Sequence, residues 1–360
     1  MGGWRACGTS RPVRGRFPFR CSSARDELLE LPGAGASIPE ISHRSPAFEA
    51  VIEEAEANLR GLLAVPENHR VLFLHGGASP QFSMAPMNLL RSRAAYVLTG
   101  TWGRKAVAEA RRHGEVDVVW DGAEDGYSTV PERLEPSPLD YLHVTSNETI
   151  EGVELQAGFE PAGGAPLVCD ASSDFLSRPI PVERYGLLYA GAQKNAGPAG
   201  LAVALIREDV LEGVREGLPK MLYYRTHATN RSLYNTPPVF AVYVFMLVTR
   251  WLRDDVGGLE RMHGTNREKA ALLYEAIDGS EAFYRGRAAA EARSLMNVTF
   301  RLPGEDIERA FVSEATANGL AELKGHRSIS GIRASIYNAM PLAGARELGA
   351  FMDAFRARHA

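Results

Sequence analysis

Short, almost uninterrupted apolar runs recur along the chain up to about residue 206, and the segments between them show the spacing of amphipathic helices. Runs without polar interruption are typical of strands that are buried on both faces of a parallel sheet. This alternation predicts an α/β fold in which helices cover a mainly parallel sheet of a seven-stranded type. The predicted strands span 71–74, 95–98, 116–120, 141–144, 166–169, 186–189 and 200–206, and helices begin at about residues 46, 80 and 102.

The pattern changes after Gly257 and Gly258, where two adjacent glycines interrupt it. Together with the length of 360 residues, this break predicts two domains, a large one over 24–257 and a small α+β domain over 258–360. In the small domain, helices are predicted from residue 259, over 305–317 and over 342–356, and strands over 297–302 and 331–337.

The first 23 residues show neither the periodicity of a helix nor that of a strand, and they are rich in arginine, with no acidic residue before Asp26. We predict an atypical, poorly ordered segment over residues 1–23, followed by a short helix from Ala24 that ends at Pro32. An Arg-rich, acid-poor start fits an organelle transit peptide, and the Ala/Arg/Gly-rich composition of a GC-rich gene accounts for it equally well. The residues alone leave these two explanations open.

Overall composition is ordinary, with 45% hydrophobic and 23% charged residues and a net charge of −4. Because no basic stripe follows the first twenty residues, nucleic acid is not expected as a partner, whereas small anionic substrates are compatible. The cysteines Cys7, Cys21 and Cys169 are too few and too unevenly spaced for a disulfide framework or a zinc site. The longest apolar run, 239–248, is far shorter than the roughly 20 residues of a membrane span. We therefore expect a soluble, cytoplasmic protein without a metal.

Lys194 is the first candidate for chemistry, because it stands without other charges in the segment AGAQKNAGPAG, between two apolar strands. Burial there would lower the pKa of its amine and make it a nucleophile toward a carbonyl carbon. An isolated lysine of this kind is more often a surface-loop residue, but Asp170 lies at the end of an earlier apolar strand. A lysine amine and an aspartate on a pyridinium nitrogen are the pair typical of pyridoxal phosphate enzymes.

Further candidates follow the predicted strands in the same way. The turn 77–79 lies between a strand and a helix start, where backbone N–H groups can hold an anion, although its spacing is that of neither Walker A nor GxGxxG. Trp102 and Thr149 also follow strands. Since ligands of such sheets lie at the carboxyl ends of the strands, one pocket can gather these residues with Asp170 and Lys194.

Asn235 and Thr236 precede two prolines and a long apolar segment. A capping residue followed by proline is typical of the first turn of a helix. We interpret the pair as the cap of a helix that runs to about residue 253.

The motifs along the chain resemble those of the phosphoserine aminotransferases. These are class-V aminotransferases, which use pyridoxal phosphate and have the fold called type I among pyridoxal phosphate enzymes. The resemblance covers almost the whole chain from about Ala24, and the motifs are highly specific as a set although each is weak alone. They are ISHR (41–44), FLHGGASPQF (73–82), TGTWGRKA (99–106), SNETIEG (146–152), CDASSDFLSRPI (169–180), YAGAQKNAGPAG (189–200), YNTPP (234–238), LKGHR (323–327) and GIRASIYNAMP (331–341).

The resemblance implies that pyridoxal 5′-phosphate is the cofactor, that Lys194 binds it covalently and then moves the proton, and that Asp170 keeps the pyridine nitrogen protonated. Trp102 would stack on the ring, and Thr149 would contact its phenolic oxygen. The site would be shared between the two subunits of a homodimer. Its phosphate ligands would be Ala78, Ser79 and Gln193, together with Asn235 and Thr236 from the partner subunit.

The resemblance also implies the substrates L-glutamate and 3-phosphohydroxypyruvate, which yield O-phospho-L-serine and 2-oxoglutarate in serine biosynthesis. The 4-phosphohydroxythreonine pair of pyridoxal phosphate biosynthesis serves part of the family as well. Each acidic substrate carries two anionic groups, which arginine binds through parallel hydrogen bonds. Arg333 would bind the α-carboxylate, and a basic rim of His43, Arg44, His326 and Arg327 would bind the other anionic group.

Two departures from the family pattern are visible. Some members have GGGRGQF where this chain has GGASPQF, so Ser79 replaces an arginine near the phosphate. The segment PVRGRFPFRCSS stands where members have a strand and a GPA-x-LP turn, with the spacing to the first helix kept. We hypothesise a frame error near the gene start, and an in-frame match to residues 1–23 on resequencing would exclude it.

Two alternatives stay open. Another class-V enzyme is one: an aminotransferase of small keto acids needs fewer basic residues at the substrate end, and a cysteine desulfurase needs a cysteine after the lysine, whereas none follows Cys169. A dimeric homologue without catalysis is the other. Such a protein would be expected to have lost Lys194, Asp170 or Arg333, and all three are present.

Overall fold

The computed structural model describes residues 11–12, 27–134, 139–155, 160–161 and 164–360 of the chain. The segment predicted over residues 1–23 thus lies outside the described residues, except for β1 (Arg11–Pro12), which pairs in parallel with β15 (Leu320–Ala321). The short helix expected from Ala24 is described only in its later part, where residues 28–29 form a turn.

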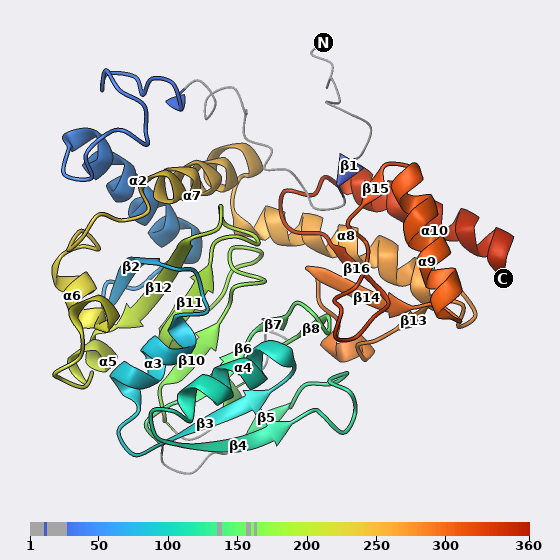
Figure 1. The fold of residues 1–360 in the computed structure, drawn as a ribbon, viewed down its shortest axis with the longest axis horizontal. Helices are drawn as coiled ribbons and strands as arrows, with labels where there is room; N and C mark the ends of the chain where they lie inside the picture. The colour runs from blue at the N-terminus through green and yellow to red at the C-terminus, as the bar shows by residue number, and fades with distance from the viewer. Residues whose placement is uncertain (1–10, 13–26, 135–138, 156–159, 162–163) are drawn as a thin grey trace.

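A seven-stranded sheet forms the centre of the molecule (Figure 1). Neighbouring strands are parallel except at β12, which is antiparallel to both of its neighbours. The predicted α/β fold with a mainly parallel sheet is therefore confirmed. In spatial order the strands are β2 (His69–His75), β12 (Leu201–Arg207), β11 (Tyr185–Gly191), β10 (Leu167–Asp170), β6 (Leu142–Thr145), β3 (Arg93–Leu98) and β4 (Glu115–Asp121).

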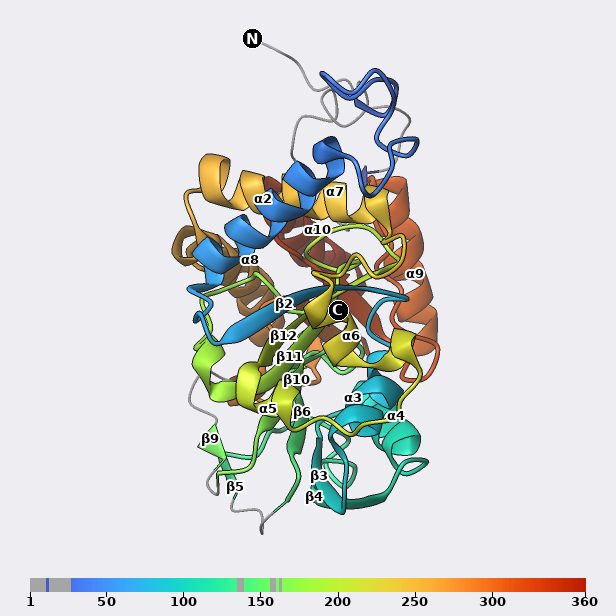
Figure 2. The same cartoon turned by 90° about the vertical axis from the view of Figure 1, so that its left-hand side faces the viewer.

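Helices cover both faces of this sheet, which is why most of its strands are apolar throughout. Two long helices lie side by side on one face, and shorter helices cover the other (Figure 2). The first pair is α2 (Pro46–Leu63) and α7 (Val239–Trp251), and the second set is α3 (Gln81–Leu89), α4 (Thr101–Ala110), α5 (Glu208–Glu212) and α6 (Tyr224–Thr229).

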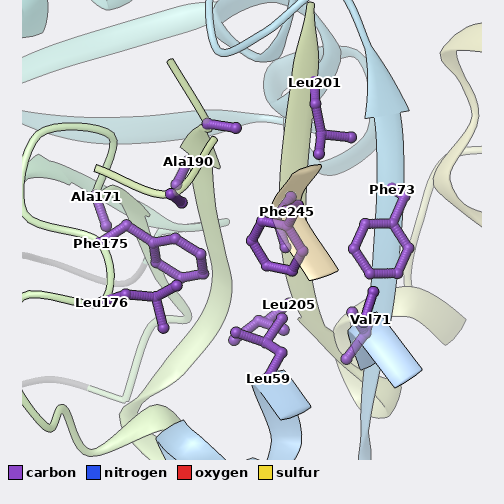
Figure 3. Packing of buried hydrophobic residues seen from close by; sticks show 14 of the residues in the cluster. Leu59, Val71, Phe73, Ala171, Phe175, Leu176, Ala190, Leu201, Leu205 and Phe245 are labelled. Atoms are coloured by element: carbon purple, nitrogen blue, oxygen red, sulfur yellow. The ribbon is translucent and has the colours of Figure 1, made fainter. Parts of the chain in front are cut away.

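Apolar side chains join α2 and α7 to the sheet. Figure 3 shows Leu59 of α2 and Phe245 of α7 against Val71, Phe73 and Leu205 of the sheet. The rings of Phe73 and Phe245 meet edge to face, with their centroids 5.7 Å apart. This core anchors β2, which ends just before the turn 76–80, and β12, which begins just after the loop that contains Lys194.

The starts of α2 and α7 show where capping rules hold and where they fail. The side chain of Ser45 accepts a hydrogen bond from the Phe48 backbone, and proline occupies the first turn, as expected for α2. In contrast, α7 begins at Val239 with Pro238 at its cap and no capping side chain. The interpretation of Asn235 and Thr236 as a cap is therefore wrong, because the two prolines carry the chain past them before the helix begins. A short π-helix (Leu252–Val256) follows α7.

The C-terminal part has its own small antiparallel sheet and its own core, at one end of the molecule (Figure 1). Gly257 and Gly258 precede it with φ of 83° and 101°, values that other residues rarely adopt. The separate core supports the predicted boundary at 257/258, which stays a prediction. The strands are β13 (Arg285–Gly286), β14 (Asn297–Arg301) and β16 (Ile332–Ser335), and the helices are α8 (Leu259–Asp278), α9 (Glu305–Ala317) and α10 (Leu342–His359).

Short elements complete the described structure. In the described ranges, no helix combines the length and the apolar character that crossing a membrane requires. The remaining strands are β5 (Arg133–Leu134), β7 (Asn147–Glu148), β8 (Val153–Glu154) and β9 (Glu160–Pro161), and the 3₁₀ turns are Val182–Arg184, Lys220–Leu222 and Ala290–Ala292.

Candidate active site

A cavity of about 360 Å³ gathers residues that follow the strands of the large sheet and residues of the C-terminal part. Six of the residues singled out from the sequence line it: Trp102, Thr149, Gln193, Lys194, His326 and Arg333. The position agrees with the rule that ligands of parallel sheets lie beyond the carboxyl ends of the strands. Ile150, Asn195, Ser335, Tyr337 and Ala339 complete the lining.

Lys194 lies in the loop between β11 and β12 and is half-buried in the cavity wall. Its Nζ donates hydrogen bonds to Thr149 Oγ1 at 2.5 Å and to Ser173 Oγ at 2.7 Å. Burial lowers the pKa of the amine to about 8, although the negative charges of Asp170 and Glu148 oppose this change. A considerable fraction of the amine is therefore neutral, and so nucleophilic, near neutral pH.

Asp170 is the last residue of β10, and its carboxyl group is buried. Its Oδ1 accepts hydrogen bonds from the Ser172 backbone at 2.9 Å and from Ser172 Oγ at 2.5 Å. Burial raises the pKa of this carboxyl group, whereas the Lys194 charge and the two Ser172 bonds act in the opposite direction. These partners stabilise a buried anion, which is the group that a protonated ring nitrogen needs.

Trp102 lies in the first turn of α4, and its ring centroid is 5.0 Å from Lys194 Nζ. The helix start is held by Glu148, whose two carboxylate oxygens accept hydrogen bonds from the backbone of Trp102 at 3.0 Å and of Gly103 at 2.8 Å. One carboxylate oxygen of Glu151, Oε1, accepts hydrogen bonds from the backbone and from the hydroxyl of Thr101. Burial, with the neighbouring Glu151 charge, raises the pKa of Glu148 to about 8. Sequence analysis did not find these two acids, although the SNETIEG motif contains both.

The turn after β2 meets the lysine loop. Gly76 and Gly77 have φ of 88° and 70°, which gives the backbone a path that residues with a Cβ rarely follow. A Cβ on Gly191 would lie 2.6 Å from Gln193 Oε1 and 3.1 Å from the Ala78 backbone nitrogen, so the lysine loop and the turn approach each other closely at this glycine. The residues predicted to hold a phosphate, Ala78 and Gln193, are thus neighbours in space.

Several predicted residues lie outside this cavity. Asn235 lies beside the same turn, with its Nδ2 3.4 Å from His75 Nε2. His43 and Arg44 precede α2 and are not part of the lining. The exposed side chains of Ser79, Thr236 and Arg327 also lie outside the lining. The assigned roles of all these residues stay predictions.

Arg333 brings positive charge to the end of the cavity that faces the C-terminal part, and His326 lies at the same end. The pKa of His326 is lowered first by burial and then by the positive charges of Arg333, Arg327 and Lys105, with Glu151 opposing. The imidazole Nδ1 lies 2.7 Å from Ser328 Oγ. This end of the cavity is suited to anionic groups.

The donor set fits pyridoxal phosphate. A lysine of lowered pKa, a buried aspartate and a flanking indole lie together, and a glycine-rich turn adjoins them. Thr149 Oγ1 and Ser173 Oγ are 2.6 Å apart and both contact the lysine amine. The indole Nε1 of Trp102 is buried without a hydrogen-bond partner in the described part of the chain. These are the groups that bind and orient such a ring.

Comparison with known proteins agrees with this assignment. The family model described as aminotransferase class-V matches residues 22–348. The phosphoserine aminotransferase of Rhodopirellula baltica is 52% identical over 341 residues, which are 93% of this chain and 91% of that protein. The solved phosphoserine aminotransferase from Bacillus circulans subsp. alkalophilus is 45% identical, with a TM-score of 0.92 over 96% of this chain and 98% of that one.

A solved structure of phosphoserine aminotransferase from Trichomonas vaginalis with bound pyridoxal phosphate is 38% identical, with a TM-score of 0.86 over 97% of this chain and all (100%) of that one. Fold, sequence and site geometry therefore agree. The chain belongs to the class-V aminotransferases and, within them, to the phosphoserine aminotransferases.

Proposed function

We propose that this protein transfers the amino group of L-glutamate to 3-phosphohydroxypyruvate and so forms O-phospho-L-serine and 2-oxoglutarate, with pyridoxal phosphate as its cofactor. The single observation that carries the proposal is the position of the Lys194 amine, between Trp102 and the hydroxyls of Thr149 and Ser173, in a cavity that also contains Arg333. Pyridoxal phosphate, when bound, supplies the electron sink that makes the Cα–H bond of an amino acid acidic.

Lys194 is the residue that moves the proton. Its amine is held by Thr149 and Ser173, and its lowered pKa of about 8 lets it both accept and donate a proton near neutral pH. The Ser172 hydrogen bonds and the Lys194 charge favour the anionic form of Asp170, which would hold a proton on the ring nitrogen of the bound cofactor. The family as a whole supports these roles, and each of them is a proposal for this chain.

The other residues of the site bind and orient the cofactor and the substrates. Trp102 covers the ring, and Glu148 fixes the helix turn that carries it. Backbone N–H groups near Ala78 and Ser79, with Gln193, hold the cofactor phosphate. Arg333 binds the α-carboxylate, and His326 and Arg327 bind the distal carboxylate or phosphate.

We further propose that the active enzyme is a homodimer in which Asn235 and Thr236 reach the site of the partner subunit, and that His43 and Arg44 belong to the basic rim that binds the distal anionic group. This arrangement gives a role to residues that lie outside the cavity of their own chain. Tyr234 and Phe240, which flank the Asn235–Thr236 pair, are large apolar side chains left exposed at 39% and 37%. We propose that the enzyme is located in the cytoplasm and acts in serine biosynthesis. With the 4-phosphohydroxythreonine pair it would also act in pyridoxal phosphate biosynthesis.

The visible absorbance of the purified protein tests the function. L-glutamate should bleach it, and 3-phosphohydroxypyruvate should restore it, whereas pyruvate and glyoxylate in separate samples should not. A Lys194→Ala variant, which keeps the cavity but lacks the amine, should not complete this cycle. Restoration by pyruvate or glyoxylate would favour an aminotransferase of small keto acids. Absence of a coloured species after addition of cofactor would favour a homologue without catalysis.

A further inference from the structure

We propose that Lys105 is an additional specificity residue, whose ammonium group binds the phosphate of the phosphorylated substrate at the rim of the cavity. The inference rests on the proposed function, because it concerns the substrate of that same site. Lys105 is not part of the cavity lining, and its side chain is exposed. Three observations nevertheless connect its charge with the cavity.

The first observation is the contact between Lys105 and Trp102. Both belong to α4, and a spacing of three residues puts them on one face of the helix. Lys105 Nζ lies 4.3 Å from the centroid of the Trp102 ring, while Lys194 Nζ lies 5.0 Å from the same centroid. The catalytic amine and the Lys105 ammonium group thus share one indole. The indole that contacts the Lys194 amine thus also carries a second positive charge beside the cavity.

The second observation is the cluster of positive charge in which Lys105 takes part. The positive charges of Arg333, Arg327 and Lys105 all act on His326, which lines the cavity. A phosphate dianion carries more charge than a carboxylate, so its binding gains more from each added cation. The charge of Lys105 therefore favours a phosphorylated acceptor over an unphosphorylated one.

The third observation concerns the acids on the same side of the cavity. Glu148 directs both carboxylate oxygens to the backbone of α4, and Glu151 directs one of its oxygens to Thr101. These hydrogen bonds hold the two carboxylates at the start of the helix, where both side chains are buried. The ammonium group of Lys105, one turn further along α4, stays available to an anionic ligand.

The neighbouring Arg104 provides a matched control. It is an exposed cation on the same helix, but its guanidinium group lies 5.9 Å from the ring of Tyr127 instead of near Trp102. Lys105→Gln and Arg104→Gln remove the same charge from adjacent surface positions. A general effect of net charge would appear equally in both variants, whereas a specific phosphate contact would appear in the first alone.

The experiment is a calorimetric titration of the full-length holoenzyme with 3-phosphoglycerate and with glycerate. 3-Phosphoglycerate carries the carboxylate and the phosphate of the acceptor but no carbonyl or amine that can react. We expect Lys105→Gln to raise the Kd of 3-phosphoglycerate by about tenfold, as expected for loss of one charge-assisted contact, and to leave that of glycerate within about twofold. Arg104→Gln should bind both compounds like the wild type.

The outcomes separate the two proposals. Full preference for 3-phosphoglycerate in Lys105→Gln would overturn the role of Lys105, as would an equal loss in both variants. A wild-type enzyme that neither prefers 3-phosphoglycerate to glycerate nor transfers an amino group to 3-phosphohydroxypyruvate would instead overturn the proposed function. The steady-state kcat/KM for 3-phosphohydroxypyruvate and hydroxypyruvate gives a second reading, in which Lys105→Gln should lower only the first value.

Discussion

The rate at which the apoenzyme takes up pyridoxal phosphate should follow the neutral fraction of the Lys194 amine. Burial lowers the pKa of this amine from 10.5 to about 8. At pH 7 about one amine in ten is then neutral, compared with about one in three thousand for an ordinary lysine. Because only the neutral amine attacks a carbonyl carbon, uptake at neutral pH should exceed that of a solvated lysine by about two orders of magnitude.

The pH dependence has a definite sign. Raising the pH deprotonates the amine, so the uptake rate should increase with pH, with a midpoint at about pH 8 and a plateau at higher pH. Asp170 and Glu148 raise the pKa of the amine, while burial and Arg333 lower it. The variant Asp170→Asn removes a charge that raises the pKa, so its midpoint should move to lower pH.

Stopped-flow absorbance of the cofactor measures the uptake rate across the pH range. Free pyridoxal phosphate titrates as well, so the reaction of Nα-acetyl-lysine under the same conditions provides the reference. Lys194→Ala should show no corresponding phase. A midpoint near the ordinary lysine pKa of about 10, or a rate that does not depend on pH, would refute the argument that the cavity activates this amine.

Three further predictions concern catalysis and stability. Asp170→Asn should lower kcat for transfer from L-glutamate by about 100-fold or more in a coupled assay at saturating cofactor, because the ring nitrogen loses its buried anion. Phe245→Ala should lower the free energy of unfolding in urea by about 3–5 kcal/mol, because this ring is fully buried against Phe73, while kcat should change little. Lys269→Met should lower stability, because the buried Lys269 Nζ donates to the carbonyls of Ile336 and Tyr337 and each unpaired carbonyl costs about 1–3 kcal/mol. Burial lowers the pKa of Lys269 from 10.5 to about 7, so the unfolded chain binds this proton more tightly than the folded protein. The free energy of unfolding of the wild type should therefore rise with pH between these two values. Urea unfolding at several pH values should show a weaker dependence of this free energy on pH in the variant.

The central sheet could be predicted because each strand carries its own signal. A strand such as 186–189 is apolar throughout, and that pattern needs burial on both faces wherever the strand lies in the sheet. The observed β11 is longer, Tyr185–Gly191, because its ends are set by hydrogen bonds to β10 and β12 and not by the apolar pattern. The order of the strands and the antiparallel β12 are likewise properties of pairing, which no single segment contains.

In the candidate site, too, some residues could be predicted from local sequence and others could not. Lys194, Asp170 and Trp102 could be named in advance, because an isolated lysine in a glycine-rich loop and polar residues at strand ends are visible locally. Glu148 and Ser173 could not, because their importance comes from partners far along the chain. Glu148 accepts from the backbone of α4, and Ser173 accepts from Lys194 Nζ.

The apolar pattern and the motifs were enough to predict the fold class, the positions of most helices and strands, and the residue types of a pyridoxal phosphate site. The neighbours of those residues in space follow only from the folded chain. The tertiary structure lowered the pKa of Lys194 by burying it, brought Arg333 from the C-terminal part to the same cavity, and removed Asn235 from the helix cap where a local rule had placed it. The physical reason is that apolar patterns and turn chemistry act over a few residues, whereas burial, electrostatics and long-range contacts depend on the whole folded chain.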